Sequence, residues 1–439
     1  MTRQRAQDDK AITALKSLLG QRLSLSKSDL ALHGRSESYF APMLPDAVAY
    51  PQSTEEVSKL VAICAAHELP VVAWGTGTSL EGHSLAVRGG VVVDFSRMAR
   101  LVALRPEDMD VTVQPGLTRE ALNEELRATG LFFPVDPGAN AALGGMAATR
   151  ASGTTAVRYG TMRDNVLALE VVLADGRVIR TGTRARKSAA GFDLTGLMVG
   201  SEGTLGLITE LTLRLHGQPE AISAGVCAFP DMGAAVAAVN AYAGMDLPLL
   251  PHLLLEFHGS EAAVAEQSRL FGEIAADHGA LGFDWSVKPE ERKALWAMRH
   301  NAFYAILATR RGARALVTDI CVPISRLAEA VEATQADIAA GTIPGPILGH
   351  VGDGNFHAVL LIDESRPEEL EEARALSDRM VRRALALGGT STGEHGVGMG
   401  KLDFMPAEHG DGWQVMGDIK RALDPKNILN PGKLVPQGD

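Results

Sequence analysis

The stretch Val71-Val72-Ala73-Trp74-Gly75-Thr76-Gly77-Thr78-Ser79 decides how the first half of the chain is interpreted, because a glycine-rich loop directly follows a short apolar strand. Small residues and hydroxyl groups at this place allow backbone N–H groups to wrap a phosphate. A dinucleotide-binding GxGxxG turn is the alternative interpretation. However, Leu80 stands where its third glycine would be, and no convincing βαβ series with the required acidic residue follows. Alone, the loop is a weak signal.

The sequence around this loop predicts an α+β arrangement. Between residues 47 and 216 short strands and turns dominate, with two amphipathic helices among them. The predicted strands are 71–74, 91–95, a hairpin over 169–180 about Asp175-Gly176, and 207–215; the predicted helices are 54–67 and 118–129. After Gly217-Gln218-Pro219 strands and helices alternate, with helices expected from Ser325 to Gly341 and from Pro367 to Gly388. We therefore expect a domain boundary near residue 217.

Bulk properties limit the class of protein. A length of 439 residues suggests two or three domains. A net charge of −11, with no run rich in lysine or arginine, argues against a nucleic-acid partner. The 3 cysteines form no CxxC pair, which fits a reducing compartment. The N-terminus lacks the apolar core of a signal peptide, and no apolar run approaches the roughly 20 residues of a transmembrane segment. We expect a cytoplasmic location, with peripheral attachment to the membrane as an open alternative.

Three further glycine-dense stretches flank strands of the same half, at 136–138, 144–149 and 201–206. Read singly, each fits an ordinary turn. Together with the loop at Gly75 they favour backbone that lines an extended flat ligand, because side chains would block its close approach. We therefore expect a large cofactor in this half.

The second half contains the most specific cluster of polar residues. His350-Val351-Gly352-Asp353-Gly354-Asn355-Phe356-His357 is followed by Glu394-His395-Gly396. Two imidazoles and a carboxylate are a usable ligand set for a divalent metal and leave positions open for a substrate. A lone histidine is more often structural. Four candidates in two tight clusters make a metal or catalytic interpretation as good as the structural one.

A glycine-rich segment and two arginines are further candidates for binding or catalysis. GVGMGK (396–401) looks superficially like a Walker loop, but His395 breaks the spacing and Leu402 replaces the required Ser or Thr, so no nucleotide-triphosphate site is expected. Arg299 and Arg314 are candidate clamps for a substrate carboxylate, because a guanidinium group binds a carboxylate through two parallel hydrogen bonds. From the sequence alone, surface arginines are the plainer interpretation.

A series of longer motifs runs in order along nearly the whole chain, from about His33-Gly34-Arg35 to Asn430-Pro431-Gly432-Lys433. They are WGTGTSLEGH, FFPVDPGAN, GGMAATRASGTTAVRYGTMRDNVLALEVVLADG, RKSAAGFDLTGLMVGSEGTLGLITE, LLLEFHGSE, TDICVPISRL, GHVGDGNFH and TGEHGVGMGK. This series resembles the FAD-linked oxidases of the vanillyl-alcohol-oxidase and p-cresol-methylhydroxylase type, and within them the cytochrome-linked D-lactate dehydrogenases.

The resemblance implies an α+β fold with a two-part FAD-binding domain of the p-cresol-methylhydroxylase (PCMH) type and an inserted α/β, ferredoxin-like substrate domain, or cap. The expected segments are an N-terminal helical segment (1–46), the FAD-binding domain (47–217), the cap (218–390) and a C-terminal segment that returns to the flavin (391–439). Near Ala235 the chain is shorter than these relatives by roughly two dozen residues, about one strand with part of its helices. We therefore expect a cap that lacks one strand.

The resemblance also implies roles for individual residues. His350, His357 and Glu394 match the family's metal ligands, for which zinc, manganese and iron are equally suitable. His395 matches its proposed base, and Arg299 and Arg314 fall where relatives hold the substrate carboxylate. Non-covalent FAD is expected, lined by residues at the matching positions Gly75, Thr76, Gly77, Thr78, Ser79, Pro137, Gly138, Gly144, Thr149, Ser152, Gly153, Tyr159, Gly160, Glu202, Gly206, Ile208 and Asn430.

The implied activity is oxidation of D-lactate and related small D-2-hydroxy acids to 2-oxo acids. An imidazole, with an unperturbed pKa of about 6.5, suits His395 for accepting the hydroxyl proton as hydride moves to flavin N5. Relatives that oxidise D-2-hydroxyglutarate carry an asparagine where Val359 stands, which favours lactate-like substrates. Glycolate or D-2-hydroxyglutarate oxidation on the same scaffold, and a flavin-binding homologue with impaired catalysis, are the alternatives.

The chain has no motif for a second redox centre. It contains neither a CxxCH haem-attachment sequence nor an iron–sulfur cysteine pattern. Electrons are therefore expected to pass to an external acceptor, which could be a c-type cytochrome, a quinone or an electron-transfer flavoprotein. A homodimer is an open alternative for the oligomeric state.

Overall fold

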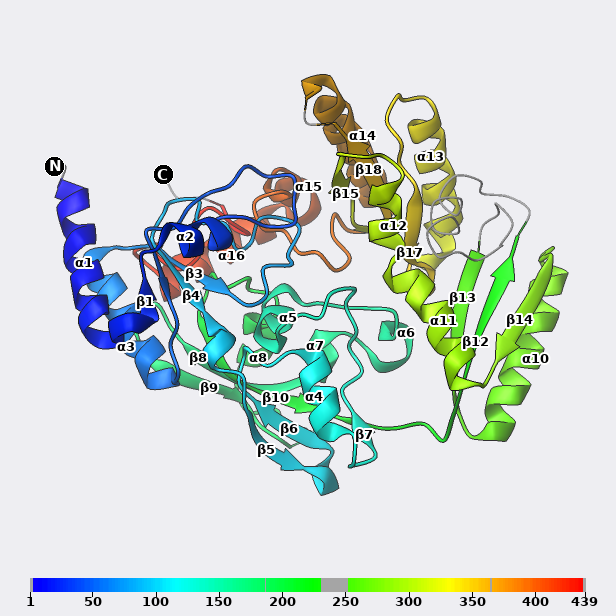
Figure 1. Cartoon of the computed structure of the whole chain (residues 1–439), viewed down its shortest axis with the longest axis horizontal. Coiled ribbons are helices and arrows are strands. Elements are labelled where there is room, and N and C mark those ends of the chain that lie inside the picture. The colour runs from blue at the N-terminus through cyan, green and yellow to red at the C-terminus, as the bar shows by residue number, and fades with distance from the viewer. Residues whose placement is uncertain (1–2, 186, 230–251, 364, 437–439) are drawn as a thin grey trace. The chain divides into compact units, whose positions relative to one another are not determined.

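The computed structural model describes residues 3–185, 187–229, 252–363 and 365–436. The chain forms two compact units. Unit 1 comprises Met1–Gly217 and Gly388–Asp439, and unit 2 comprises Gln218–Leu387. Figure 1 labels the elements in chain order. The strand expected to be missing near Ala235 lies outside the described residues.

The first sheet of unit 1 has four strands in the order β1-β2-β4-β3. β2, β4 and β3 run parallel, and a parallel pair needs a crossover, which α3 supplies between β2 and β3. α3 begins where the Ser53 hydroxyl accepts a hydrogen bond from Glu56 N. α1 and α3 bury an apolar face that includes Leu15 and Leu60. The bounds are α1 (Arg3–Leu19), β1 (Leu23–Ser24), β2 (Ala47–Ala49), α3 (Thr54–His67), β3 (Val71–Trp74) and β4 (Val91–Asp94).

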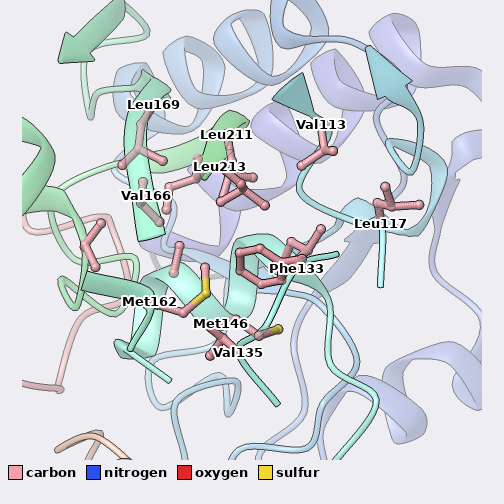
Figure 2. Close-up of a cluster of buried hydrophobic side chains, with 14 of the residues drawn as sticks. Val113, Leu117, Phe133, Val135, Met146, Met162, Val166, Leu169, Leu211 and Leu213 are labelled. Carbon is pink, nitrogen blue, oxygen red and sulfur yellow. The ribbon is translucent and has the colours of Figure 1, made fainter. Parts of the chain in front are cut away.

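The second sheet of unit 1 is fully antiparallel, with five strands in the order β5-β6-β10-β8-β9. One face carries the main apolar core, in which Phe133 lies among Leu211 and Leu213 of β10, Leu169 of β8 and Met146 of α5 (Figure 2). These side chains are buried because alternate residues of each strand point to the same face. The bounds are β5 (Leu101–Arg105), β6 (Asp110–Val113), α5 (Leu143–Thr149), β8 (Val166–Val172), β9 (Val178–Gly182) and β10 (Leu207–Arg214).

The C-terminal segment completes unit 1. It pairs with the edge of the first sheet, where Val71 N donates to Ile428 O at 2.7 Å and Asn430 N donates to Val71 O at 2.8 Å. The remaining elements of this unit are α2 (Lys27–His33), α4 (Arg119–Leu126), β7 (Leu131–Phe132), α6 (Ala156–Tyr159), α7 (Met162–Asn165), α8 (Leu194–Met198), β11 (His216–Gly217), α15 (Met405–His409) and α16 (Asp411–Leu423).

The described residues of unit 2 form two antiparallel sheets. The first has the order β13-β12-β14 and packs against α10 and α11. In the second, β18 is the central strand, paired with β15 and β16 on one edge and with β17 on the other. The bounds are β12 (Ala221–Ala228), β13 (His252–Gly259), α10 (Glu261–Asp277), β14 (Gly282–Ser286), α11 (Pro289–His300), α12 (Ala302–Ala308), β15 (Arg314–Val317), β16 (Ile320–Cys321), α13 (Leu327–Ala339), β17 (Ile347–His350), β18 (Asn355–Ile362) and α14 (Pro367–Ala386).

Most of the elements predicted from sequence are confirmed, including α3, β3, β10, α14 and the hairpin of β8 and β9. The helix expected from Ser325 to Gly341 is confirmed as α13 (Leu327–Ala339), but the prediction that Ser325 caps it is wrong. Its cap position is Arg326, and Ser325 lies in a 3-10 turn that Pro323 initiates, with Arg326 N donating to Pro323 O. Among the described residues, no helix combines the length and apolar character needed to cross a membrane.

Candidate active site

The glycine-rich loop follows β3 directly, as predicted. Gly77 has a φ of +74°, which glycine adopts without strain. Within the described part of the chain, none of the backbone amides from Thr76 to Ser79 donates a hydrogen bond to another protein group. Consecutive free amides in a small-residue loop are suited to bind phosphate oxygens. The loop therefore fits a pyrophosphate-bearing cofactor.

A buried histidine that sequence reasoning missed supports the base of this loop. His33 Nε2 lies 2.9 Å from Asp94 Oδ2, and its ring packs 4.6 Å from the Trp74 ring, centroid to centroid. Burial disfavours the charged imidazole, but the hydrogen bonds to Asp94 and to the Asp29 carbonyl, with the charges of both carboxylates, together outweigh burial and raise the pKa of His33 above its usual value. The contact with Asp94 thus holds the ring that packs against Trp74 at the end of β3.

The other glycine-dense stretches come together in unit 1. Asp136 Oδ1 accepts a hydrogen bond from Thr155 N at 2.9 Å, which joins the loop of Pro137 and Gly138 to that of Ser152 and Gly153. Glu202 N donates to Ala148 O at 2.9 Å, so the turn at 201–206 lies against the end of α5. Backbone that is far apart in sequence therefore forms one neighbourhood, as a large cofactor would require.

Asn430 joins this neighbourhood from the C-terminal segment. Its Nδ2 donates to Glu202 O at 2.6 Å, and its Oδ1 accepts from Lys433 Nζ at 2.6 Å. Lys433 also donates to His83 O and Leu85 O and is 1% exposed. Burial lowers the pKa of Lys433 to about 7, although nearby Glu202 opposes the shift. The network fixes which way the Asn430 amide points.

Two of the three predicted metal ligands lie together in unit 2. His350 ends β17 and His357 lies on β18; their ring centroids are 5.8 Å apart, and each offers a ring nitrogen within 4.8 Å of the other's. His357 Nδ1 lies 3.0 Å from Thr318 O. Because a carbonyl only accepts, Nδ1 must carry the proton, and Nε2 then keeps its lone pair for a metal. The donor set fits a divalent cation.

The third predicted ligand, Glu394, and the predicted base, His395, belong to unit 1. They are half-buried in a segment without helix or strand. The backbone just after them is bound to Glu202, because Val397 N donates to Oε1 at 2.7 Å and Gly398 N to Oε2 at 2.8 Å. The predicted metal set is thus divided between the two units.

The predicted carboxylate clamps lie in unit 2. Arg299 is on the last turn of α11 and Arg314 begins β15, and both are half-buried. Val359, on β18 two residues after His357, is 1% exposed and packs in an apolar cluster with Ile306.

Sequence reasoning missed several buried polar residues around these positions, among them His33, His83, Asp319 and Lys433. Asp319 is 1% exposed; its Oδ1 accepts from Asn355 Nδ2 at 2.8 Å and lies 3.6 Å from His357 Nδ1. Asp319 and Lys433 stand in quoted motifs, TDICVPISRL and NPGK, but no local spacing indicated their partners.

Two family descriptions match the chain. "FAD binding domain" matches residues 45–182, and "FAD linked oxidases, C-terminal domain" matches residues 234–434. A probable mitochondrial D-lactate dehydrogenase of Danio rerio is 46% identical, over 97% of this chain and 92% of the relative. A mitochondrial D-lactate dehydrogenase (cytochrome) of Arabidopsis thaliana is 44% identical, over 97% of this chain and 80% of the relative.

Solved structures share the fold at low identity. p-Cresol methylhydroxylase with substrate bound matches with a TM-score of 0.77 and 17% identity, over 98% of this chain and 97% of that chain. Alkyldihydroxyacetonephosphate synthase matches with a TM-score of 0.74 and 20% identity, over 96% and 84%. The expected α+β fold with a PCMH-type FAD-binding domain is therefore confirmed. The family matches and the relatives make the protein a flavoprotein oxidoreductase. The chain belongs to the FAD-linked oxidases.

Proposed function

We propose that the protein is an FAD-dependent dehydrogenase that oxidises D-lactate and related small D-2-hydroxy acids to 2-oxo acids. The observation that carries the proposal is the identity of 46% and 44%, over 97% of this chain, to proteins named D-lactate dehydrogenase. A Bacillus subtilis protein named glycolate oxidase subunit GlcD is 34% identical over 89% of the chain, so glycolate is the second candidate substrate.

Unit 1 would bind FAD non-covalently, and unit 2 would form the cap. The free amides of Thr76 to Ser79 would hold the pyrophosphate, and the glycine-dense backbone around Gly138, Gly144 and Gly153, with Asn430, would line the rest. When bound, FAD supplies the hydride acceptor.

The remaining predicted site residues would bind the substrate and accept its hydroxyl proton. His350, His357 and Glu394 would hold a divalent cation, which when bound supplies a Lewis acid that favours loss of the hydroxyl proton. His395 would accept that proton as a neutral imidazole. Arg299 and Arg314 would bind and orient the carboxylate, because a fork of N–H groups matches its two oxygens.

Electrons would then leave to an external acceptor. A cytochrome is the first candidate, because relatives in Arabidopsis thaliana and Kluyveromyces lactis carry that term in their names. A quinone or an electron-transfer flavoprotein is the alternative.

Anaerobic reduction of the purified protein tests the proposal. D-lactate is expected to bleach the flavin absorption band faster than L-lactate, glycolate or D-2-hydroxyglutarate, and a chelator is expected to slow the reaction. Failure of every 2-hydroxy acid to reduce the flavin would contradict the activity. An unchanged rate with chelator would contradict only the metal role.

A further inference from the structure

The segment GVGMGK (396–401) directly follows Glu394 and His395. We propose that Glu202 is a positioning residue whose buried carboxylate, bound by the backbone of this segment, fixes Glu394 and His395 on unit 1. The inference rests on the proposed function of those two residues. It also explains why glycines follow them in the sequence.

The first step is the geometry of the carboxylate. Glu202 is 5% exposed, and each of its oxygens accepts one backbone hydrogen bond, from Val397 and from Gly398. His83 Nε2 lies 3.2 Å from Oε1. Burial disfavours the charged form, but His83 and the two amides hold the pKa of Glu202 below its usual value. The segment therefore binds an anion, and that anion is a side chain of the protein itself.

The second step explains the glycines. A Cβ on Gly396 would stand 2.7 Å from both Glu202 Oε1 and His83 Nε2, and one on Gly398 would stand 2.1 Å from Glu81 O. Both residues also have positive φ, of 82° and 50°. Only glycine allows the backbone to approach these groups so closely.

The third step is a second tether that closes the segment. Lys401, 5% exposed, donates from Nζ to Ser391 O at 2.8 Å, so the two ends of 391–401 are joined. The same Nζ lies 3.5 Å from Glu81 Oε1, and Met399 N donates to Glu81 O at 2.9 Å. Glu394 and His395 thus lie on a short loop that is bound on its C-terminal side and closed at its ends.

Glu202 also connects the segment of the proposed base, His395, to a residue proposed to line the flavin. Glu202 binds the backbone two residues after His395 through its side chain, and through its own carbonyl it accepts from Asn430 Nδ2. A single residue therefore links the proposed proton acceptor to a proposed flavin-lining residue. Fixing reacting groups within about 1 Å is worth up to about 100-fold in rate.

Glu202→Gln tests the proposal, because it keeps the size of the side chain but presents an NH2 group to one amide donor. We expect the rate constant for anaerobic flavin reduction by saturating D-lactate, measured per bound flavin, to fall about 100-fold, while the half-saturating D-lactate concentration changes little. Hydrogen exchange at the Val397 and Gly398 amides should accelerate. Gly396→Ala disturbs the same contact from the other side and should give the same result.

Asp110→Asn is the matched control, since Asp110 is a buried carboxylate on β6 that pairs with Arg105 and Arg184. It should leave the reduction rate and the exchange at Val397 unchanged. A rate per bound flavin in Glu202→Gln and Gly396→Ala equal to the parent's would overturn the proposal. If Glu202→Gln does not fold, Glu202→Asp, which keeps the charge, is measured in its place. Failure of the parent to react with D-lactate would contradict the proposed activity, while hydrogen exchange still tests whether Glu202 holds the segment.

Discussion

His357 is proposed to bind the metal and His395 to accept the proton, and different kinds of structure position these two residues. His357 lies on the central strand of a sheet, with β15, β16 and β17 paired to the same strand. His395 lies outside any helix or strand, and its segment is held by contacts with Glu202, 195 residues away from Val397 in sequence. Sheet register positions the first residue, whereas a few buried polar contacts position the second.

The difference predicts unequal tolerance to change. A strand within a ladder shares its backbone hydrogen bonds among several neighbours, so loss of one side-chain contact leaves its path intact. A loop held by a few separate contacts, among them those of Glu202 and Lys401, depends more strongly on each of them. Substitutions around His395 should therefore have larger and more local effects than equivalent substitutions around His357.

The largest effect is expected at the base itself. His395→Asn removes the group that accepts the proton but keeps a polar side chain of similar reach. The rate constant for flavin reduction by D-lactate should fall about 100- to 10,000-fold, the usual contribution of general-base catalysis. Stopped-flow absorbance measures it. FAD content should match that of the parent, and a loss below tenfold would show that another group takes the proton.

The second-largest effect is expected near His357, on metal binding. Asp319→Asn removes the buried charge beside Nδ1 while the Thr318 carbonyl still fixes the protonated nitrogen. We expect the affinity for Zn²⁺ or Mn²⁺, measured by equilibrium binding to the purified protein, to fall about 10- to 100-fold. Asp337→Asn, which alters a half-buried carboxylate of unit 2 that is paired with Arg383, is the control. Equal metal affinities in the parent, Asp319→Asn and Asp337→Asn would show that Asp319 does not contribute to metal binding.

A smaller effect concerns the closure of the loop around His395. Lys401→Met leaves the buried Ser391 carbonyl without this donor, which should lower the free energy of unfolding by about 1–3 kcal/mol. Urea unfolding followed by tryptophan fluorescence measures it. Lys59→Met is the control, because its exposed pair with Glu55 should contribute less than about 1 kcal/mol. Equal losses in both variants would show that the loop does not depend on Lys401.

The smallest effect is a pH dependence of stability, which distinguishes the contribution of His33 to unit 1 from that of Glu202. The pKa of His33 is raised, so its stabilisation is present in full below the unfolded pKa of about 6.5 and is lost as pH rises through the folded value. Glu202 has a lowered pKa, so its contribution is kept above about pH 4.5. His33→Gln should therefore lower the unfolding midpoint more at about pH 5.5 than at about pH 8.5. A pH-independent difference would show that His33 is neutral in the folded protein.

The sequence predicted what short-range patterns determine. α3, β3 and the hairpin of β8 and β9 follow from apolar periodicity and from the Asp175-Gly176 turn, and the loop from Gly75 to Ser79 was found because its glycines and hydroxyl residues stand close together in the sequence. The contacts of Glu202, Lys433 and Asp319 could not be predicted in this way. Their partners are backbone groups or side chains brought near only by the complete fold, and no spacing along the chain encodes them.

The attachment of the C-terminal segment to β3 also governs the order in which the chain can fold. Lys433 binds the carbonyl of His83, 350 residues earlier, and Asn430 pairs with Val71. During synthesis the ribosome therefore completes all of unit 2 before the residues that seal unit 1 exist. Contacts so distant in sequence are slow to form, and until then the edge of β3 stays open to unwanted strand pairing. The segment Gly388–Asp439 therefore completes a domain that begins at the N-terminus, and its removal would leave that domain unfinished.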